Sequence, residues 1–226
     1  MKEDVIVEFP LSGEWFVGAD GTEKGHELAF DFVRVDARLR ATRTTALREL
    51  LTTVPLTDYY GWGQPIHAPF DGHVITAIDG CPEVSRSVAS ILFDSLVSLF
   101  SSGQEALIAR MKADGDGDIR CFAGNHLVIE SSLRPGVFAF IAHARSGSLT
   151  VARGETVSAG QPVAEVGNSG LSTMPHLHFH VMSDPSPLTD RVIPFRFARY
   201  EALIDGQWQL REASLPTRRQ RIRRVD

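Results

Sequence analysis

Most of this chain consists of short runs in which apolar and polar residues alternate, separated by turn residues. Clear examples are residues 28–35, 72–78 and 126–130. Alternation with a period of two is typical of a β-strand with one buried face, and strands with turns about every 8–12 residues indicate an all-β domain. The pattern therefore predicts a mainly β fold, an antiparallel β-sandwich or barrel.

Further strands are predicted toward both ends of the chain. The dipeptide Asp71-Gly72 is the turn signal of a hairpin that leads into residues 72–78. Apolar segments bounded by Gly, Pro or Asp predict the remaining strands at 5–10, 14–17, 137–143 and, as a pair around a glycine turn, 151–166.

Two stretches have a helical pattern instead. Residues 46–51 predict a short helix. Over 82–113 apolar residues recur at helical spacing, and we expect a helical insertion between neighbouring strands. The Asp-Gly repeat at 114–118 resembles a calcium loop, but it lacks the terminal glutamate of such a loop and therefore predicts a turn.

Composition agrees with a folded chain that has its own core. The 226 residues are 43% hydrophobic, which allows one large domain or two small ones. We expect a single domain over 1–200 that includes the insertion, and a C-terminal extension over 201–226 that ends in an arginine-rich tail. Such a tail either binds an anionic polymer or is a solvated end, which is the commoner case. The net charge of −5 argues against nucleic acid as a partner.

The sequence shows no membrane or export signal. No apolar run approaches the ~18 residues of a membrane span, and residues 1–5 contain no apolar signal-peptide core. We therefore expect either a cytoplasmic protein or one that acts outside the cytoplasm after a signal is removed. Cys81 and Cys121 bracket the insertion and either form a disulfide or stay as two thiols. No oligomeric state is predicted.

Chemistry-bearing residues concentrate in one predicted strand late in the chain. His176, His178 and His180 alternate with Leu177 and Phe179, so the three imidazoles share one face while the apolar pair faces the core. Neighbouring imidazoles on that face are about 6.6 Å apart. One of them can bind a metal ion while the next reaches another ligand of that ion. The pattern therefore predicts a metal or proton-transfer site.

A carboxylate in an earlier strand is a candidate partner of these histidines. Asp31 lies between apolar residues, where a carboxylate is costly to bury unless it is paired or bound to a metal. His26, just before that strand, could share a cation with Asp31. Asp36 is the rival carboxylate, but its place at the end of the run indicates a turn residue. His143 ends another predicted strand and is a further candidate.

Two loops are candidate walls of a cleft. Residues 59–63 are aromatic and glycine-rich, and residues 167–173 are polar and lead into the histidine strand. Each could equally be a packed turn. As cleft walls they would, together with the end of the histidine strand, offer a substrate five side chains: Tyr60, Trp62, Asn168, Ser172 and His180.

These residues together resemble the motifs of the M23 peptidases, the zinc endopeptidases of the lysostaphin and LytM type. That family has a His followed closely by an Asp on a strand, a later strand that ends in a His, and His-x-His near the end. All three occur here in the same order, at 26–31, at 143 and at 176–178. Three further stretches are similar to signatures of the family: 65–74, 154–166 and 167–179.

The resemblance implies a duplicated hybrid motif, a barrel-sandwich fold of the LytM type, with one Zn²⁺ per chain held by His26, Asp31 and His178. His143 and His176 then match the catalytic histidines of the family. Two imidazoles and one carboxylate leave one position of a tetrahedral zinc open for water. There are two departures: four residues instead of three separate His26 from Asp31, and His180 stands where a glutamate is common.

The function that the resemblance implies is zinc-dependent hydrolysis of peptide bonds in the stems or cross-bridges of bacterial peptidoglycan. A zinc-bound water with a pKa of about 7 would attack the scissile carbonyl. One catalytic histidine would accept its proton, and the other would stabilise the tetrahedral intermediate or pass the proton to the leaving amine. The sequence does not assign these two roles.

Three other classes of protein fit parts of the chain. A non-catalytic LytM-like binding or activator module would share the fold, but such modules often lack a ligand, and all five expected positions are filled here. A biotinyl or lipoyl carrier would need a lysine at the tip of the hairpin in 154–166, which has none. A phosphocarrier with paired histidines needs no metal, so zinc content distinguishes it from a peptidase.

Overall fold

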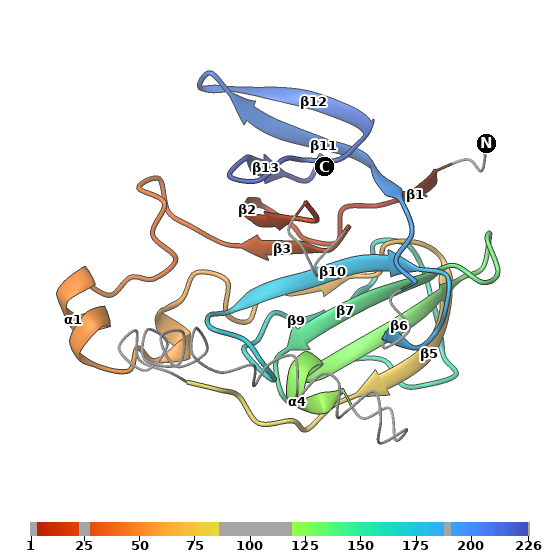
Figure 1. Ribbon diagram of the computed structural model, residues 1–226, viewed down its shortest axis with the longest axis horizontal. Helices are drawn as coiled ribbons and strands as arrows, with labels where there is room; N and C mark the ends of the chain where they lie inside the picture. The colour runs from red at the N-terminus through yellow and green to blue at the C-terminus, as the bar shows by residue number, and fades with distance from the viewer. Residues whose placement is uncertain (1–3, 23–27, 86–118, 188–190, 226) are drawn as a thin grey trace.

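The computed structural model describes residues 4–22, 28–85, 119–187 and 191–225. His26 lies outside these ranges, and so does the predicted helical insertion from residue 86 onward. Strands predominate in the described part of the chain (Figure 1), which confirms the predicted mainly β fold.

The described strands and helices have the following bounds. The strands are β1 (Val5–Val7), β2 (Glu14–Asp20), β3 (Phe30–Val33), β4 (Pro65–His67), β5 (Gly72–Ile78), β6 (Asn125–Ser131), β7 (Phe138–Ala144), β8 (Thr156–Val157), β9 (Pro162–Glu165), β10 (His176–Met182), β11 (Phe195–Ile204), β12 (Gln207–Ser214) and β13 (Arg221–Arg223). The helices are α1 (Ala46–Leu51), the 3-10 helix η1 (Leu56–Asp58) and α4 (Arg120–Ala123). The short helix predicted at 46–51 is therefore confirmed.

Strands from both ends of the chain form one large sheet. Its order is β1-β11-β13-β2-β3-β10-β7-β6-β5-β8, with β12 paired to β11, while β4 and β9 form a second, two-stranded sheet. The β1–β11 pair is parallel and the other strand pairs are antiparallel. Among the described residues this order is open, so the sheet does not close into a barrel.

Strand β10 lies inside this sheet between β3 and β7 (Figure 1). Its register places His178 opposite Asp31 of β3 on one side and opposite Ala142 of β7 on the other. Residues that lie opposite each other in paired strands point to the same face of the sheet. The register of β10 therefore brings an early carboxylate and a late histidine onto one face.

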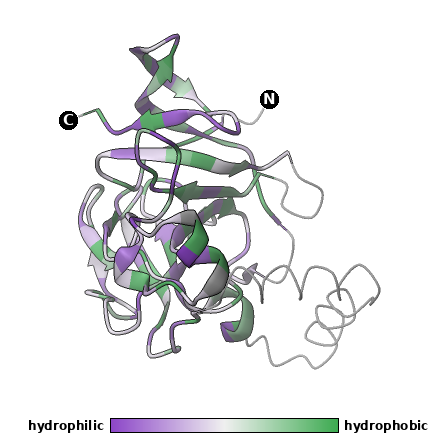
Figure 2. Cartoon of the chain, turned by 90° about the vertical axis from the view of Figure 1, so that its left-hand side faces the viewer, coloured by the Kyte–Doolittle hydropathy of each residue, from purple (hydrophilic) through white to green (hydrophobic). Residues whose placement is uncertain are grey.

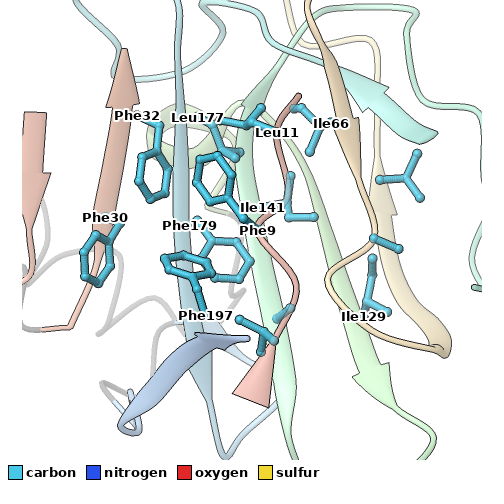
Figure 3. Packing of buried hydrophobic residues seen from close by; sticks show 14 of the residues in the cluster. Phe9, Leu11, Phe30, Phe32, Ile66, Ile129, Ile141, Leu177, Phe179 and Phe197 are labelled. Carbon is cyan, nitrogen blue, oxygen red and sulfur yellow. The ribbon is translucent and has the colours of Figure 1, made fainter. Parts of the chain in front are cut away.

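The other face of β10 packs into an aromatic core (Figure 3). Leu177 and Phe179 are 0% exposed, as the alternation predicts. The ring of Phe179 lies 5.5 Å from that of Phe195 and 6.0 Å from that of Phe197, between centroids. Burial of one such side chain stabilises the fold by about 1.5–3 kcal/mol. This packing fixes β10 and, with it, the direction in which its histidines point.

The C-terminal segment is part of the sheet. The sequence predicts a solvated, frayed end, but β13 pairs with β2 and its Ile222 is 0% exposed. Arg221 forms an ion pair with Glu14, and the Arg223 Nε lies 2.5 Å from a carboxylate oxygen of Glu201. The frayed end is therefore wrong for these residues, because the apolar Ile222 between two arginines supplies a buried contact. The domain division at residue 200 stays a prediction.

Two further features complete the fold. The β11–β12 hairpin protrudes at one end of the molecule and carries both hydrophilic and hydrophobic residues (Figure 2). Cys81 is half-buried, Cys121 is exposed, and the two are not joined in a disulfide. Within the described ranges, no helix has both the length and the apolar character needed to cross a membrane.

Candidate active site

Three adjacent strands bring four of the predicted site residues together. The Oδ1 atom of Asp31 on β3 lies 2.9 Å from Nδ1 of His178 and 3.6 Å from Nε2 of His176, both on β10. The ring centroid of His143, on β7, is 4.7 Å from that of His176 and 5.9 Å from that of His178. We call these four residues the His–Asp cluster. The fifth predicted residue, His26, lies outside the described residues.

The backbone of His143 is in an unusual conformation. Its φ of +61° lies in the left-handed region, which costs a non-glycine residue about 1–3 kcal/mol. Two bonds hold it there: its carbonyl accepts from the Gly167 N–H at 3.0 Å, and its Nδ1 lies 2.8 Å from the Ser169 carbonyl oxygen. Strain of this kind persists where the surroundings over-determine the position, as they do at functional sites.

The protonated nitrogen of each candidate catalytic histidine follows from its hydrogen bond. His143 Nδ1 faces the Ser169 carbonyl and His176 Nδ1 faces the Met174 carbonyl, each at 2.8 Å. A carbonyl can only accept, so Nδ1 carries the proton in both rings and Nε2 keeps its lone pair when the ring is neutral. Both rings therefore present Nε2 as a proton acceptor.

Burial keeps both of these rings neutral near pH 7. It lowers the pKa of His143 well below the ordinary value, and the neighbouring His176 and His178 lower it further. Burial also lowers the pKa of His176, although the charge of Asp31 acts in the opposite direction. A neutral imidazole is the form that a general base needs.

Asp31 is held as a carboxylate. Burial alone would raise its pKa, but the hydrogen bond with His178, together with the neighbouring imidazoles, outweighs burial and lowers it well below the usual range. The rival carboxylate, Asp36, accepts hydrogen bonds from the backbone N–H groups of Arg38 and Arg40, at 2.8 and 2.9 Å. Asp36 therefore belongs to a local turn, as predicted, and Asp31 belongs to the cluster.

The described part of the cluster fits a zinc ion by its chemistry. Imidazole nitrogen and carboxylate oxygen are preferred zinc donors, and His178 Nδ1 and Asp31 Oδ1 stand side by side at 2.9 Å. A shared cation would replace this hydrogen bond. Among the described residues no group of three His, Cys, Asp or Glu side chains is arranged to hold a metal ion, and the third candidate donor, His26, is not described.

His180 is buried and lies against His178. It is 8% exposed, and its Nδ1 lies 3.2 Å from Nε2 of His178. The ring of Phe140, on the neighbouring strand β7, packs 4.9 Å from His180 and 6.1 Å from His178, between centroids. Residues in such contacts orient a metal-binding histidine. Phe140 was not predicted as a site residue, because only the register of β7 with β10 places it opposite His180.

The polar loop before β10 is folded inward. Asn168 and Ser172 are only 2% and 3% exposed. The Ser172 hydroxyl donates to Asn168 Oδ1 at 2.7 Å and lies 3.1 Å from His176 Nδ1. Their burial favours support of this loop, including its Ser169 carbonyl, over direct contact with a substrate.

The aromatic loop 59–63 lies against the segment that leads into β10. A Cβ atom on Gly61 would be 3.0 Å from the carbonyl oxygen of Pro175, the residue before His176. The guanidinium of Arg43 stacks over Tyr60 at 4.9 Å, and that of Arg145 lies 5.9 Å from the ring centroid of Trp62. This position suits the predicted cleft wall. The arginines were not predicted, because only the fold brings them to the loop.

Comparison with known proteins connects this cluster to a family. Residues 106–189 match the model of peptidase family M23, and they contain His143, β10 and the loop before it. A comparison with curated proteins gave no match.

Three solved structures illustrate the likeness in fold. One is a catalytic-domain mutant of the prophage-encoded M23 protein EnpA from Enterococcus faecalis, with 16% identity over 80% of this chain and 88% of that chain and a TM-score of 0.43. The catalytic domain of the antimicrobial peptidase lysostaphin from Staphylococcus simulans has 16% identity over 83% and 86%, with a TM-score of 0.39. A zinc-containing peptidase from Vibrio cholerae has 20% identity over 72% and 37%, with a TM-score of 0.35.

With TM-scores in this range, the assignment depends on the family match. That match covers less than half of the chain, but it is the part that carries three of the four residues of the His–Asp cluster. Residues 106–189 are therefore the part of this chain that is similar to peptidase family M23.

Proposed function

We propose that this protein is a zinc-dependent endopeptidase that hydrolyses peptide bonds in peptidoglycan stems or cross-bridges. The observation that supports this most directly is the pairing of Asp31 Oδ1 with His178 Nδ1 at 2.9 Å. Beside this pair lie the rings of His143 and His176, whose centroids are 4.7 Å apart. The first pair supplies metal donors and the second supplies proton acceptors. A hydrolase needs both within reach of one bond.

Asp31 and His178 would hold one zinc ion, with His26 as the third ligand. Such an ion, when bound, polarises the scissile carbonyl and makes a water molecule nucleophilic near neutral pH. His180 and Phe140 keep the His178 ring in place, since a metal-binding imidazole depends on its outer contacts for orientation.

His143 and His176 would handle the proton and the developing charge. Each neutral ring presents Nε2, because Nδ1 is bound to a backbone carbonyl. One ring accepts the proton of the attacking water. The other receives that same proton at Nε2 and, in the protonated form, donates a hydrogen bond to the oxyanion or passes the proton to the leaving amine, so that one proton moves from the water to the amine.

The substrate class is tested with purified peptidoglycan. We expect the zinc-loaded protein to release fragments with new amino termini, which mass analysis identifies together with the cleaved bond. The same protein after chelation should release none. If the zinc-loaded protein leaves peptidoglycan intact and cleaves no stem or bridge peptide, the proposal is wrong.

A non-catalytic LytM-like module is the second candidate. Asp31 and His178 satisfy each other in a direct hydrogen bond at 2.9 Å, which needs no metal to be stable. Such a module would bind peptidoglycan in a sedimentation assay without releasing fragments, whereas the peptidase would release them.

A further inference from the structure

The carboxylate of Glu83 bonds to two loops, one that follows β7 and one that precedes β10. Glu83, in the segment after β5, accepts a hydrogen bond at 2.6 Å from the backbone N–H of Ser146 through Oε1. Through Oε2 it accepts another at 2.7 Å from the backbone N–H of Asn168. Ser146 follows β7 and Asn168 precedes β10, so this side chain bonds to two loops that the bond from the Gly167 N–H to the His143 carbonyl also connects.

The loop that begins at Asn168 contacts both candidate catalytic histidines. Ser146 comes three residues after His143. Asn168 is adjacent to Ser169, whose carbonyl accepts from His143 Nδ1 at 2.8 Å. The Asn168 side chain in turn accepts from Ser172, which lies 3.1 Å from His176 Nδ1. Glu83 is therefore connected to the His143 ring through Asn168 and Ser169, and to the His176 ring through Asn168 and Ser172.

The segment that carries Glu83 is itself held firmly in place. Backbone atoms of Val84 bond to both the backbone and the side chain of Asn168, the first contact at 2.9 Å. A carboxylate oxygen of Asp79 accepts from the Gly147 N–H at 2.8 Å. The Asn125 amide donates to the carbonyls of both Cys81 and Ala144 at 3.0 Å. These hydrogen bonds fix the backbone on both sides of Glu83 and therefore the position from which its side chain extends.

The charge of Glu83 strengthens these two bonds. Burial raises the pKa of Glu83 above its ordinary value, and the charge of Asp79 adds to this, although the bonds from Ser146 and Asn168 and the charge of Arg145 act in the opposite direction. Hydrogen bonds to an ionised acceptor are about twice as strong as bonds between neutral groups. A neutral amide in the same place would accept only one of the two N–H groups and would set its own NH₂ against the other.

We propose that Glu83 is a positioning residue of the peptidase, which clamps the Ser146 and Asn168 amides so that the Ser169 carbonyl keeps His143 in its reactive orientation. The residue does not touch the reacting atoms. This inference depends on the proposed function for its kinetic consequence, but the clamp itself can be measured without any activity.

The kinetic arm compares Glu83→Gln and Glu83→Asp with Glu155→Gln. Glu155, on an exposed hairpin, accepts a hydrogen bond at 3.0 Å from the backbone N–H of Ala152. Glu155→Gln therefore makes the same chemical change away from the two loops that Glu83 joins. On soluble peptides prepared from peptidoglycan, both Glu83 variants should lose about tenfold or more in kcat, with zinc content and KM unchanged. Glu155→Gln should match the wild type. A wild-type kcat in folded Glu83→Gln overturns the proposal.

The spectroscopic arm follows the Nδ1–H proton of His143. This proton gives a downfield resonance, assigned by its loss in His143→Ala. It should shift or broaden in Glu83→Gln and stay unchanged in Glu155→Gln, and an unchanged resonance in Glu83→Gln contradicts the clamp.

Should the Glu83 variants not fold, amide exchange in the wild type decides: slow exchange at Ser146 and Asn168 supports the clamp, and fast exchange at both rules it out. A protein that hydrolyses nothing defeats the proposed function but still yields this result.

Discussion

The histidines of the His–Asp cluster have two kinds of environment, and these environments separate the roles of chemically identical side chains. His143 and His176 donate from Nδ1 to backbone carbonyls, whereas His178 places Nδ1 against Asp31. A ring whose Nδ1 is committed to a carbonyl can move a proton at Nε2. A ring whose Nδ1 faces a carboxylate can share a cation with it.

These environments predict different losses when single histidines are removed. His143→Ala and His176→Ala should keep zinc but lose hydrolysis by about 10²–10⁴-fold, the range that general acid–base groups contribute. The measurement is zinc content by mass spectrometry beside the rate of peptidoglycan cleavage. His73→Ala, at an exposed position on β5, is the control and should change neither. Full activity in either cluster variant would remove that residue from the mechanism.

The sequence alone predicts which side chains gather at this site but not what holds them. Alternation along 176–180 puts three imidazoles on one face, and an Asp among apolar residues indicates a partnered carboxylate. No sequence pattern indicates the groups that hold these side chains: the carbonyls of Ser169 and Met174 and the carboxylate of Glu83. Any residue has a carbonyl, and Glu83 lies in a segment whose partners are set only by the fold.

At the scale of elements, the loop 167–173 depends on close backbone approach. A Cβ on Gly170 would lie 2.3 Å from the Phe122 carbonyl oxygen and 2.4 Å from the Gly124 nitrogen, and the φ of Gly170 is +72°. A side chain therefore cannot enter without moving the loop. Since Ser169 precedes Gly170, such a movement would also displace the carbonyl that holds His143.

Gly170→Ala should lower both stability and activity. The left-handed backbone alone costs about 1–2 kcal/mol, and the clash with Phe122 and Gly124 adds to this cost. Gly206→Ala separates the two effects, because Gly206 has a φ of +78° and nothing within 4 Å of an added Cβ. In urea unfolding, Gly206→Ala should show only the backbone cost and retain full hydrolysis. Equal losses in the two variants would show that the close approach is unimportant.

The strands themselves are the most predictable elements, because their alternation is set by burial on one face. The register between β3 and β10 is less predictable: it joins residues 31 and 178 across most of the chain, and no local pattern encodes it. The resemblance to M23 motifs supplies that pairing, since it implies that Asp31 and His178 share a metal.

At the scale of the whole molecule, the C-terminal strand β13 is part of the large sheet and pairs with β2. β13 inserts between β11 and β2, which continues to β3 and so to β10. Ile222 is buried in the core, although arginines surround it in the sequence. A basic, polar tail does not indicate a strand, so composition alone suggests a solvated end there.

Ile222→Ala should therefore destabilise the protein by about 2–5 kcal/mol, as other buried Ile→Ala changes do. Leu210→Ala, on the outer strand β12 where the side chain is 51% exposed, should cost less than about 0.5 kcal/mol. Thermal or urea unfolding of both variants gives the comparison. A native-like stability for Ile222→Ala would mean that β13 does not contribute to the folded sheet.

Metal content measured on a matched set of variants tests the central claim most directly. The purified wild type should hold about one zinc per chain, while Asp31→Ala and His178→Ala should lose it. Asp36→Ala, which removes a carboxylate five residues along the chain that is bound to Arg40 in a turn, should keep it. A wild type that hydrolyses peptides without metal, or zinc that is lost with Asp36 and retained without Asp31, would contradict the assignment of this cluster as the zinc site.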